Sequence, residues 1–293
     1  MIIKGIDNGY GYTKDESLNI FRSAYTTEEP LSLYSGHPIT VDGVPYWVGT
    51  GRGTVDINKS DSLLNKIGTL TCLALTPGTD FCIVAGLPVN QFKQDKDVLR
   101  RTIIGYSGTS ISLGTNSPKT IRIHDVAVYP QSVATLYSSN ITDDVILVDI
   151  GYRTVDMVLI QFTQNKPAIS LSDTYYCGMF SLYDLISNTI NQKFGLTTSA
   201  LEMEHLLERG LYIDGIKQDL GFLSSVLRQY YNDLFTQLTL KYPIRTTPIM
   251  LTGGGAHFVQ KAFSNRFPQT IVHKNNQFSN ALGYHRIGLK LFS

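Results

Sequence analysis

One short pattern occurs twice in this chain, and it constrains the fold more than any other feature. Residues 6–14 read IDNGYGYTK and residues 148–156 read VDIGYRTVD, so both contain an apolar residue followed by Asp-x-Gly-Tyr. Each copy lies at the end of a short apolar run typical of a buried strand. Two unrelated tight hairpins would also give this pattern. The repetition about half a chain apart favours two halves that present equivalent turns.

A strand that ends in Asp-x-Gly is suited to holding phosphate. Glycine lets the backbone bend tightly and approach a ligand closely, and the exposed N–H groups of such a turn hold phosphate oxygens. The carboxylate at the strand end accepts water molecules from Mg²⁺, which prefers oxygen ligands. Two such turns that face each other across a cleft predict a clamp for one polyphosphate.

A third glycine-rich element follows near the C-terminus. Residues 249–259 read IMLTGGGAHFV, an apolar strand followed by three glycines and the start of a helix. The glycines let a flat or phosphorylated ligand lie against the backbone, and a helix start favours negative charge. The segment is neither GxGxxG nor a Walker A motif, and alone it is a weak signal. Beside the repeated turn it adds to the prediction of a nucleotide site.

Composition excludes several function classes. The chain has 293 residues, of which 42% are hydrophobic and 17% charged, and a formal net charge of +1. This composition is typical of a folded protein with a sizeable core, and the scattered basic residues predict no direct binding of nucleic acid. No stretch approaches 18 apolar residues, so we expect no membrane span. The N-terminus does not resemble a signal peptide, and three cysteines without a CxxC favour free thiols in the cytoplasm.

Strands and helices alternate along the chain, which predicts an α/β fold. We expect a meander over 1–25, a hairpin with an Asp-Gly turn over 41–51, and a helix over 62–76 that begins after Asp61. A buried strand over 81–89, a short helix over 95–106 and a helix over 131–139 follow. The pattern then restarts with a strand, turn and strand over 143–162. Helices are expected over 177–194, 200–213, 220–242, 256–263 and 276–292.

The order of these elements resembles the actin, Hsp70 and sugar-kinase superfamily of ATPases. The first phosphate loop of actin, Asp-Asn-Gly-x-Gly-x-x-Lys, is matched by Asp7, Asn8, Gly9, Gly11 and Lys14. The second, Asp-x-Gly-x-x-Thr-x-Asp, is matched by Asp149, Gly151, Thr154 and Asp156. LTGGGA resembles the adenosine loop, and VAVYPQSVATLY resembles the first connecting helix.

Within this superfamily, the chain length and the QFSNALGY ending, with Asn280, Gly283 and Tyr284, look most like the ParM-type plasmid-segregation actins. The resemblance implies a two-domain actin-like, ribonuclease H-like α/β fold with a nucleotide cleft between the domains. Domain I would be 1–148 plus 271–293, and domain II would be 149–270. The chain departs from the pattern at Arg153, in a short region over 193–215, and over 25–76, where no motif is found.

The resemblance also implies roles for individual residues. Catalytic roles fall to Gln131, Asp149 and Asp156, and the metal ligands would be Asp7 and Asp149. The nucleotide-binding residues would be Asp7, Asn8, Gly9, Tyr10, Gly11, Lys14, Gly151, Tyr152, Arg153, Thr154, Gly178, Gly253, Gly254 and Gly255. Glu202 and Lys217 are weaker candidates on the adenine side.

Plainer roles remain open for four of these residues. Lys14 could be a solvated strand residue, Gln131 a helix-start residue without a catalytic role, Asp156 a strand-end cap, and Gly178 only a helix start. The histidines show no metal-ligand spacing and are interpreted as structural or surface residues.

The resemblance implies a filament-forming protein that hydrolyses ATP, or GTP, with Mg²⁺ and moves plasmid DNA through a DNA-binding adaptor. Its partners would be further copies of itself, arranged head to tail, and the adaptor, with no direct contact to nucleic acid or membrane. A small-molecule kinase of the same superfamily and an actin-like scaffold are the alternatives, because fold alone does not fix function. The chain shows no substrate motif for a kinase and no membrane-binding helix typical of such scaffolds.

Overall fold

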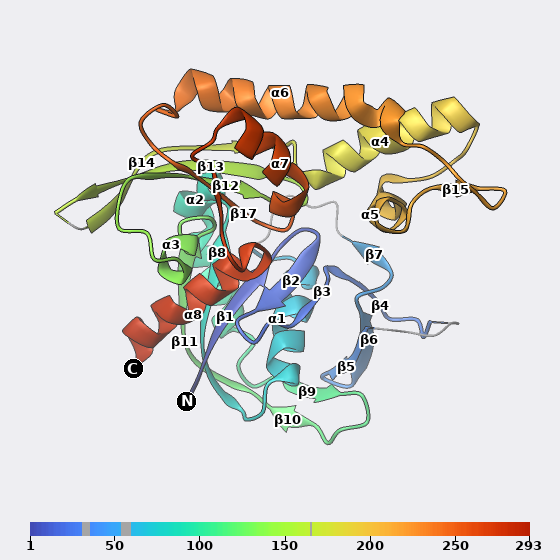
Figure 1. Ribbon diagram of the computed structural model, residues 1–293. Coiled ribbons are helices and arrows are strands. Elements are labelled where there is room, and N and C mark those ends of the chain that lie inside the picture. The colour runs from blue at the N-terminus through green and yellow to red at the C-terminus, as the bar shows by residue number, and fades with distance from the viewer. Residues whose placement is uncertain (31–35, 54–59, 165) are drawn as a thin grey trace.

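The computed structural model describes residues 1–30, 36–53, 60–164 and 166–293. Two five-stranded sheets, each covered by helices, form the two halves of the molecule (Figure 1). The chain is therefore an α/β protein, as the alternation of strands and helices predicts.

The first sheet has the strand order β11-β8-β1-β2-β3. Its strands are β1 (Ile2–Asn8), β2 (Tyr12–Asp15), β3 (Ile20–Arg22), β8 (Asp80–Leu87) and β11 (Arg122–Pro130). Strand β1 pairs antiparallel with β2 and parallel with β8. The first Asp-x-Gly-Tyr turn is thus the hairpin between β1 and β2.

The second sheet has the order β14-β13-β12-β17-β18. Its strands are β12 (Val145–Ile150), β13 (Val155–Thr163), β14 (Lys166–Tyr175), β17 (Ile249–Thr252) and β18 (Ile271–Val272). Strand β12 pairs antiparallel with β13 and parallel with β17. The β12–β13 hairpin therefore occupies in this sheet the place that the β1–β2 hairpin occupies in the first.

A further sheet, in the order β10-β9-β5-β6-β4-β7, accounts for much of the region without a motif. Its strands are β4 (Ala24–Thr26), β5 (His37–Val41), β6 (Val44–Val48), β7 (Arg52–Gly53), β9 (Ser110–Leu113) and β10 (Lys119–Thr120). Strands β5 and β6 form the predicted hairpin, with φ of +48° at Asp42 and +84° at Gly43. Positive φ at both central residues is the geometry that favours Asp-Gly. Residues 31–35 and 54–59 of the motif-free region lie outside the described part.

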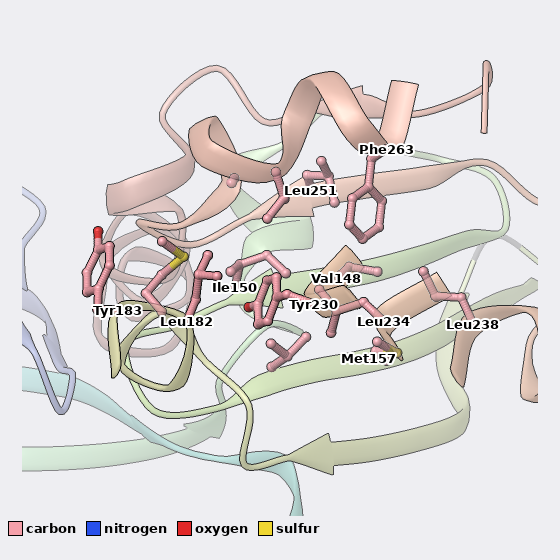
Figure 2. Close-up of a cluster of buried hydrophobic side chains, with 14 of the residues drawn as sticks. Val148, Ile150, Met157, Leu182, Tyr183, Tyr230, Leu234, Leu238, Leu251 and Phe263 are labelled. Atoms are coloured by element: carbon pink, nitrogen blue, oxygen red, sulfur yellow. The ribbon is translucent and has the colours of Figure 1, made fainter. Parts of the chain in front are cut away.

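Helices cover one face of the second sheet and enclose the core drawn in Figure 2. They are α4 (Met179–Phe194), α6 (Ser224–Lys241), which follows the 3₁₀ turn η1 (Gly221–Leu223), and α7 (Ala256–Arg266), whereas α5 (Ala200–Arg209) packs against α4. Leu234 and Leu238 of α6 and Phe263 of α7 pack with Val148 and Leu251 of the strands into one apolar core (Figure 2). A small hairpin of β15 (Tyr212–Ile213) and β16 (Ile216–Lys217) follows α5. The region over 193–215, which was expected to be short, thus contains the end of α4, all of α5 and the first strand of this hairpin.

The C-terminal helix returns to the first sheet. Helix α8 (Ser279–Phe292), which follows the 3₁₀ turn η2 (Asn276–Phe278), packs beside β1 and β8 (Figure 1). Tyr284 and Ile287 on this helix form a buried cluster with Val84 and Ala134. The end of the chain therefore completes the half in which the chain begins.

Four helix predictions need correction, the first being the helix expected over 200–213, which ends at Arg209 and is followed by strand β15. Helix α1 (Leu63–Leu75) is capped by Ser62, whose side chain accepts from the Asn65 N–H, and not by Asp61. Helix α2 (Val89–Ile104) starts directly after Pro88, earlier than predicted, and the Pro88 carbonyl accepts the first helical hydrogen bonds from the Gln91 and Phe92 N–H groups. The helix expected over 131–139 is only the single turn α3 (Thr135–Ser138), since residues 131–134 form tight turns.

All three cysteines are free thiols, and Cys72 and Cys82 are buried. Within the described residues, no helix combines the length and apolar character that a membrane span requires.

Candidate functional site

The two repeated turns have the same backbone geometry. The Gly9 N–H donates to the Tyr12 carbonyl at 3.0 Å, and the Gly151 N–H donates to the Thr154 carbonyl at 2.9 Å. A Cβ on Gly9 or Gly151 would lie 2.7 or 2.9 Å from the same carbonyl oxygens. Both turns therefore require glycine at this place, which explains why the pattern repeats.

The aspartate of each turn ends a central strand and is buried, with 4% of Asp7 and 7% of Asp149 exposed. In the hairpin register, Asp7 lies opposite Lys14, whereas Asp149 lies opposite Asp156. The Lys14 ammonium is 3.5 Å from Asp7 Oδ2. The two halves thus place carboxylates at equivalent positions, but the residue opposite the aspartate is a cation in the first half and an acid in the second.

Burial raises the pKa of the Asp149 carboxyl, and the negative charge of Asp7 raises it further. The hydrogen bond from Asn280 and the positive charge of Lys14 act against this rise. Burial disfavours the charged form of an acid, and a nearby like charge does the same. A cation bound beside both carboxylates would remove that penalty.

The segment that leaves β11 contacts both aspartates. Gln131 Nε2 donates to Asp7 Oδ1 at 3.0 Å, and the Ser132 hydroxyl donates to Asp149 Oδ2 at 3.4 Å. Asn280, at the start of α8, donates to the same Asp149 oxygen at 3.0 Å. Gln131 was a sequence candidate, whereas the contacts of Ser132 and Asn280 with Asp149 are visible only in the structure.

The three glycines after β17 form the wall beside Asp149. Gly253 has a φ of +83°, and a Cβ there would lie 2.2 Å from Asp149 Oδ1. Gly254 is exposed, and a Cβ there would meet nothing closer than 3.9 Å. The loop leads directly into α7, whose N-terminus favours negative charge. This loop therefore combines a fixed contact to the carboxylate with an open backbone face.

These elements enclose one cleft of about 800 Å³, counting space open to solvent. Most of the predicted site residues line it. They are Asp7, Gly9, Tyr10, Gly11, Lys14, Gln131, Asp149, Gly151, Tyr152, Thr154, Asp156, Gly253, Gly254 and Gly255.

Three predicted site residues lie outside the lining. Asn8 turns toward α1, where its Nδ2 donates to Asn65 Oδ1 at 2.6 Å, so it anchors the first turn to this helix. Gly178 donates its N–H to the Arg153 carbonyl at 3.0 Å and so joins the start of α4 to the second turn. The Arg153 guanidinium lies over the Tyr10 ring at 5.3 Å, linking the tips of the two turns.

The cleft also contains residues that sequence reasoning missed. They are Tyr12, Met179, Tyr183, Glu204, Asn276, Gln277 and Asn280. The Tyr12 hydroxyl donates to Glu204 Oε2 at 2.6 Å, which joins the first turn to α5 across the cleft. The acidic residue of α5 in the cleft is therefore Glu204, not Glu202, whose side chain caps α5 by accepting from Ser199.

Lys217, the other adenine-side candidate, belongs to the exposed strand β16 and does not line the cleft. No sequence signal separates Glu204 from the other charges of α5, because its role depends on Tyr12, 192 positions away.

Mg²⁺ fits the carboxylate end of the cleft. Asp7 and Asp149 supply the oxygen ligands that this ion prefers, and it keeps several waters and phosphate oxygens in such sites. Within the described ranges, no three His, Cys, Asp or Glu side chains gather as a metal cluster. The donor set therefore suits a cation that arrives with phosphates rather than one held by protein alone.

Two family models match the two halves of the chain. Residues 5–133 match the model described as the N-terminal domain of actin-like proteins. Residues 147–265 match the model of the archaeal actin homologue, MreB-like, C-terminal. The boundary between the two matches falls between the two repeated turns, which lie in different models.

Curated and solved relatives match over almost the whole chain. An archaeal actin homologue of Thermoplasma acidophilum is 24% identical over 97% of this chain and 98% of its own. The subunit of a 15-stranded ParM filament from Clostridium botulinum superimposes with a TM-score of 0.85 at 20% identity, covering 99% of this chain and 100% of its own. An archaeal actin homologue in complex with ADP gives a TM-score of 0.83 at 18% identity, with 99% and 100% covered. The two-half architecture is therefore that of the actin-like fold.

Proposed function

Because the chain belongs to the actin-like proteins, we propose that it is a filament-forming nucleotide hydrolase whose cleft binds ATP, or GTP, together with Mg²⁺. The observation that carries the proposal is the pair of equivalent hairpin turns, which present Asp7 and Asp149 to one cleft from opposite halves. The archaeal homologue solved with ADP supports a nucleotide as the ligand.

The phosphates would lie between the two turns. The N–H groups around Gly9, Gly11, Gly151 and Thr154 would hold the phosphate oxygens, as backbone amides do in phosphate loops. Lys14 would add a point charge. Asp7 and Asp149 would hold the water shell of Mg²⁺, which neutralises the charge that builds up on the phosphates.

Hydrolysis of a nucleotide depends mainly on positioning and charge stabilisation. Gln131 would orient the attacking water, and its amide at the carboxylate end of the cleft, 3.0 Å from Asp7, supports this role. Asp156 lines the same cleft and accepts a hydrogen bond from the Thr174 hydroxyl, so its carboxylate is fixed in place. Asp156 would polarise the water that Gln131 orients.

The base and ribose would occupy the side of the cleft formed by the glycine loop and the helices. Met179, Tyr183 and Gln277 line this side, and the open backbone face at Gly254 lets a flat ring lie against the loop. Apolar and aromatic side chains with a few polar groups are typical of such subsites.

Filament formation completes the proposal. Relatives of this fold form filaments, among them the ParM filament from Clostridium botulinum, and head-to-tail contacts that do not close generate such assemblies. We propose that residues 1–148 plus 271–293 and residues 149–270 close on the nucleotide as two domains. The assembled protein would segregate plasmid DNA in the cytoplasm through a DNA-binding adaptor, as the ParM likeness suggests.

A sedimentation assay tests this function. The protein is incubated with Mg·ATP, with Mg·GTP and without nucleotide, then pelleted and inspected by negative-stain electron microscopy. The proposal expects filaments only with a nucleotide. Tight nucleotide binding with no filaments under any condition would contradict it, and would direct the next screen to phosphate acceptors for a kinase.

A further inference from the structure

Ser132 has a backbone conformation that a serine rarely adopts. Its φ is +66°, and the Val133 N–H donates to the Gln131 carbonyl at 2.7 Å across it. This combination is that of the γ-turn with positive φ, which is rare and strained. Ser132 is also completely buried. Strained buried residues persist only where the surrounding structure holds them, and they concentrate at functional sites.

Asn280 is the group that holds this turn. The Ser132 N–H donates to Asn280 Oδ1 at 2.9 Å. Because a backbone N–H can only donate, the amide oxygen of Asn280 must face Ser132, and its NH₂ group must face Asp149. That NH₂ group donates to Asp149 Oδ2 at 3.0 Å. One side chain thus fixes both the strained turn and the carboxylate.

The Asp149 carboxylate is restrained on both sides. Its Oδ2 accepts from Asn280 and from the Ser132 hydroxyl at 3.4 Å. Its Oδ1 lies against Gly253, where an added Cβ would come within 2.2 Å. The carboxylate plane is therefore set by groups from three separate elements, namely the segment after β11, helix α8 and the glycine loop.

We propose that Asn280, assisted by Ser132, is a positioning residue that orients the Asp149 carboxylate toward the Mg²⁺ that accompanies the nucleotide. This inference rests on the proposed function. Hydrogen-bond partners of a ligating carboxylate commonly change metal affinity by about 10- to 100-fold when they are removed. The Asn280 side chain bonds to the Asp149 carboxylate and to the Ser132 N–H, so it acts on the metal site through Asp149.

Ser279 provides a matched control in the same helix turn. It is as buried as Asn280, with 1% exposed against 6%, and it begins α8. Its hydroxyl donates to the Asn276 carbonyl at 3.0 Å and lies 3.1 Å from Thr135 Oγ1. Loss of this hydroxyl disturbs the packing of α8 without removing a bond to Asp149.

The test measures how Mg²⁺ strengthens nucleotide binding by the full chain. Binding of a fluorescent ADP analogue is titrated with MgCl₂ and, separately, in EDTA, for the wild type, Asn280→Ala, Ser132→Ala and Ser279→Ala. The measured quantity is the Mg²⁺ midpoint, which is the MgCl₂ concentration that gives half of the Mg²⁺-dependent gain in nucleotide binding. We expect Asn280→Ala to raise this midpoint about 10-fold and Ser132→Ala to raise it about threefold. Affinity in EDTA should stay within about twofold for both, and Ser279→Ala should keep the wild-type midpoint.

A purely structural role would weaken binding equally with and without Mg²⁺, and that result would overturn the inference, as would an unchanged midpoint in Asn280→Ala. If Asn280→Ala does not fold, Ser132→Ala, which loses only a hydroxyl, decides the question by the same criteria. A wild type whose nucleotide binding ignores Mg²⁺ would instead overturn the proposed function, and the inference with it. The two failures are therefore distinguishable.

Discussion

Gln131 and Ser132 are consecutive in the chain, yet their side chains bond to aspartates of opposite halves. Gln131 reaches Asp7 at 3.0 Å and Ser132 reaches Asp149 at 3.4 Å. The positive φ at Ser132 turns the two side chains to different partners. A single dipeptide therefore couples the carboxylates on which the proposed chemistry depends.

Gln131→Ala is expected to slow nucleotide hydrolysis more than nucleotide binding. The loss of a positioned polar group in the reaction commonly lowers kcat by about 10²-fold, whereas binding rests on the backbone of the two turns. Phosphate release and equilibrium binding measure the two effects separately. Gln161→Ala, on the exposed face of β13, is the control. Equal losses in turnover and affinity would point to a structural role for Gln131.

Asp149→Asn is expected to stabilise the metal-free protein at neutral pH by roughly 1 kcal/mol while impairing Mg²⁺ binding, since functional carboxylates trade stability for function. The pKa of Asp149 is raised in the folded state, so the folded protein binds this proton more tightly than the unfolded chain. The stabilisation that this tighter proton binding gives to the folded wild type is fully present below the ordinary Asp pKa. It is lost as pH rises through the raised pKa of Asp149.

Urea unfolding in EDTA, from below the ordinary Asp pKa up to neutral pH, checks this prediction. The stability difference between Asp149→Asn and the wild type should grow as pH rises through that window. If the stability difference between the variant and the wild type did not depend on pH, the raised pKa could not belong to Asp149.

Tyr12→Phe is expected to speed release of bound nucleotide several-fold. The substitution removes the 2.6 Å hydrogen bond to Glu204, which joins the first turn to α5 across the cleft, and keeps the ring. A hydrogen bond to a charged group contributes about 1.5–3 kcal/mol, and partial exposure of both residues lowers this. Stopped-flow displacement of a fluorescent nucleotide measures release, with the exposed Tyr212→Phe as control. Unchanged release would show that the bond does not limit opening.

Gly253→Ala should lower the free energy of unfolding, whereas Gly254→Ala should leave it almost unchanged. At Gly253 the φ of +83° and the contact with Asp149 both oppose a methyl group, so we expect a loss of about 2 kcal/mol or more. At Gly254 an added Cβ would meet nothing closer than the Gln277 side chain at 3.9 Å, so the free energy of unfolding should change by less than about 0.5 kcal/mol. Thermal and urea denaturation compare the two, and equal losses would contradict the geometry described for the loop.

The sequence was sufficient to predict the cleft-lining residues whose positions depend on the local backbone. Asp7, Gly9, Asp149 and Gly151 belong to short hairpins whose turn geometry is encoded within a few residues, and all four line the cleft. The glycine loop was predicted for the same reason. Strand and helix alternation was sufficient to predict the α/β class.

Contacts between distant segments could not be predicted in this way. Glu204 is positioned by its hydrogen bond with Tyr12. Asn280 is positioned by its hydrogen bonds with Ser132 and Asp149. Each of these bonds joins residues more than 130 positions apart in the sequence. Periodicity assigned residues 131–139 to a helix because it does not detect a positive φ at a serine. These residues become visible only when both halves are assembled.

The most direct test of the account is right-angle light scattering with phosphate release followed in the same cuvette, for the wild type and Asp149→Asn. The account predicts that Mg·ATP or Mg·GTP raises the scattering of the wild type, with phosphate release following assembly. Asp149→Asn should release almost no phosphate. Assembly that proceeds equally without nucleotide, or a normal rate of phosphate release by Asp149→Asn, would contradict the claim that the two aspartates form the site that couples nucleotide to filaments.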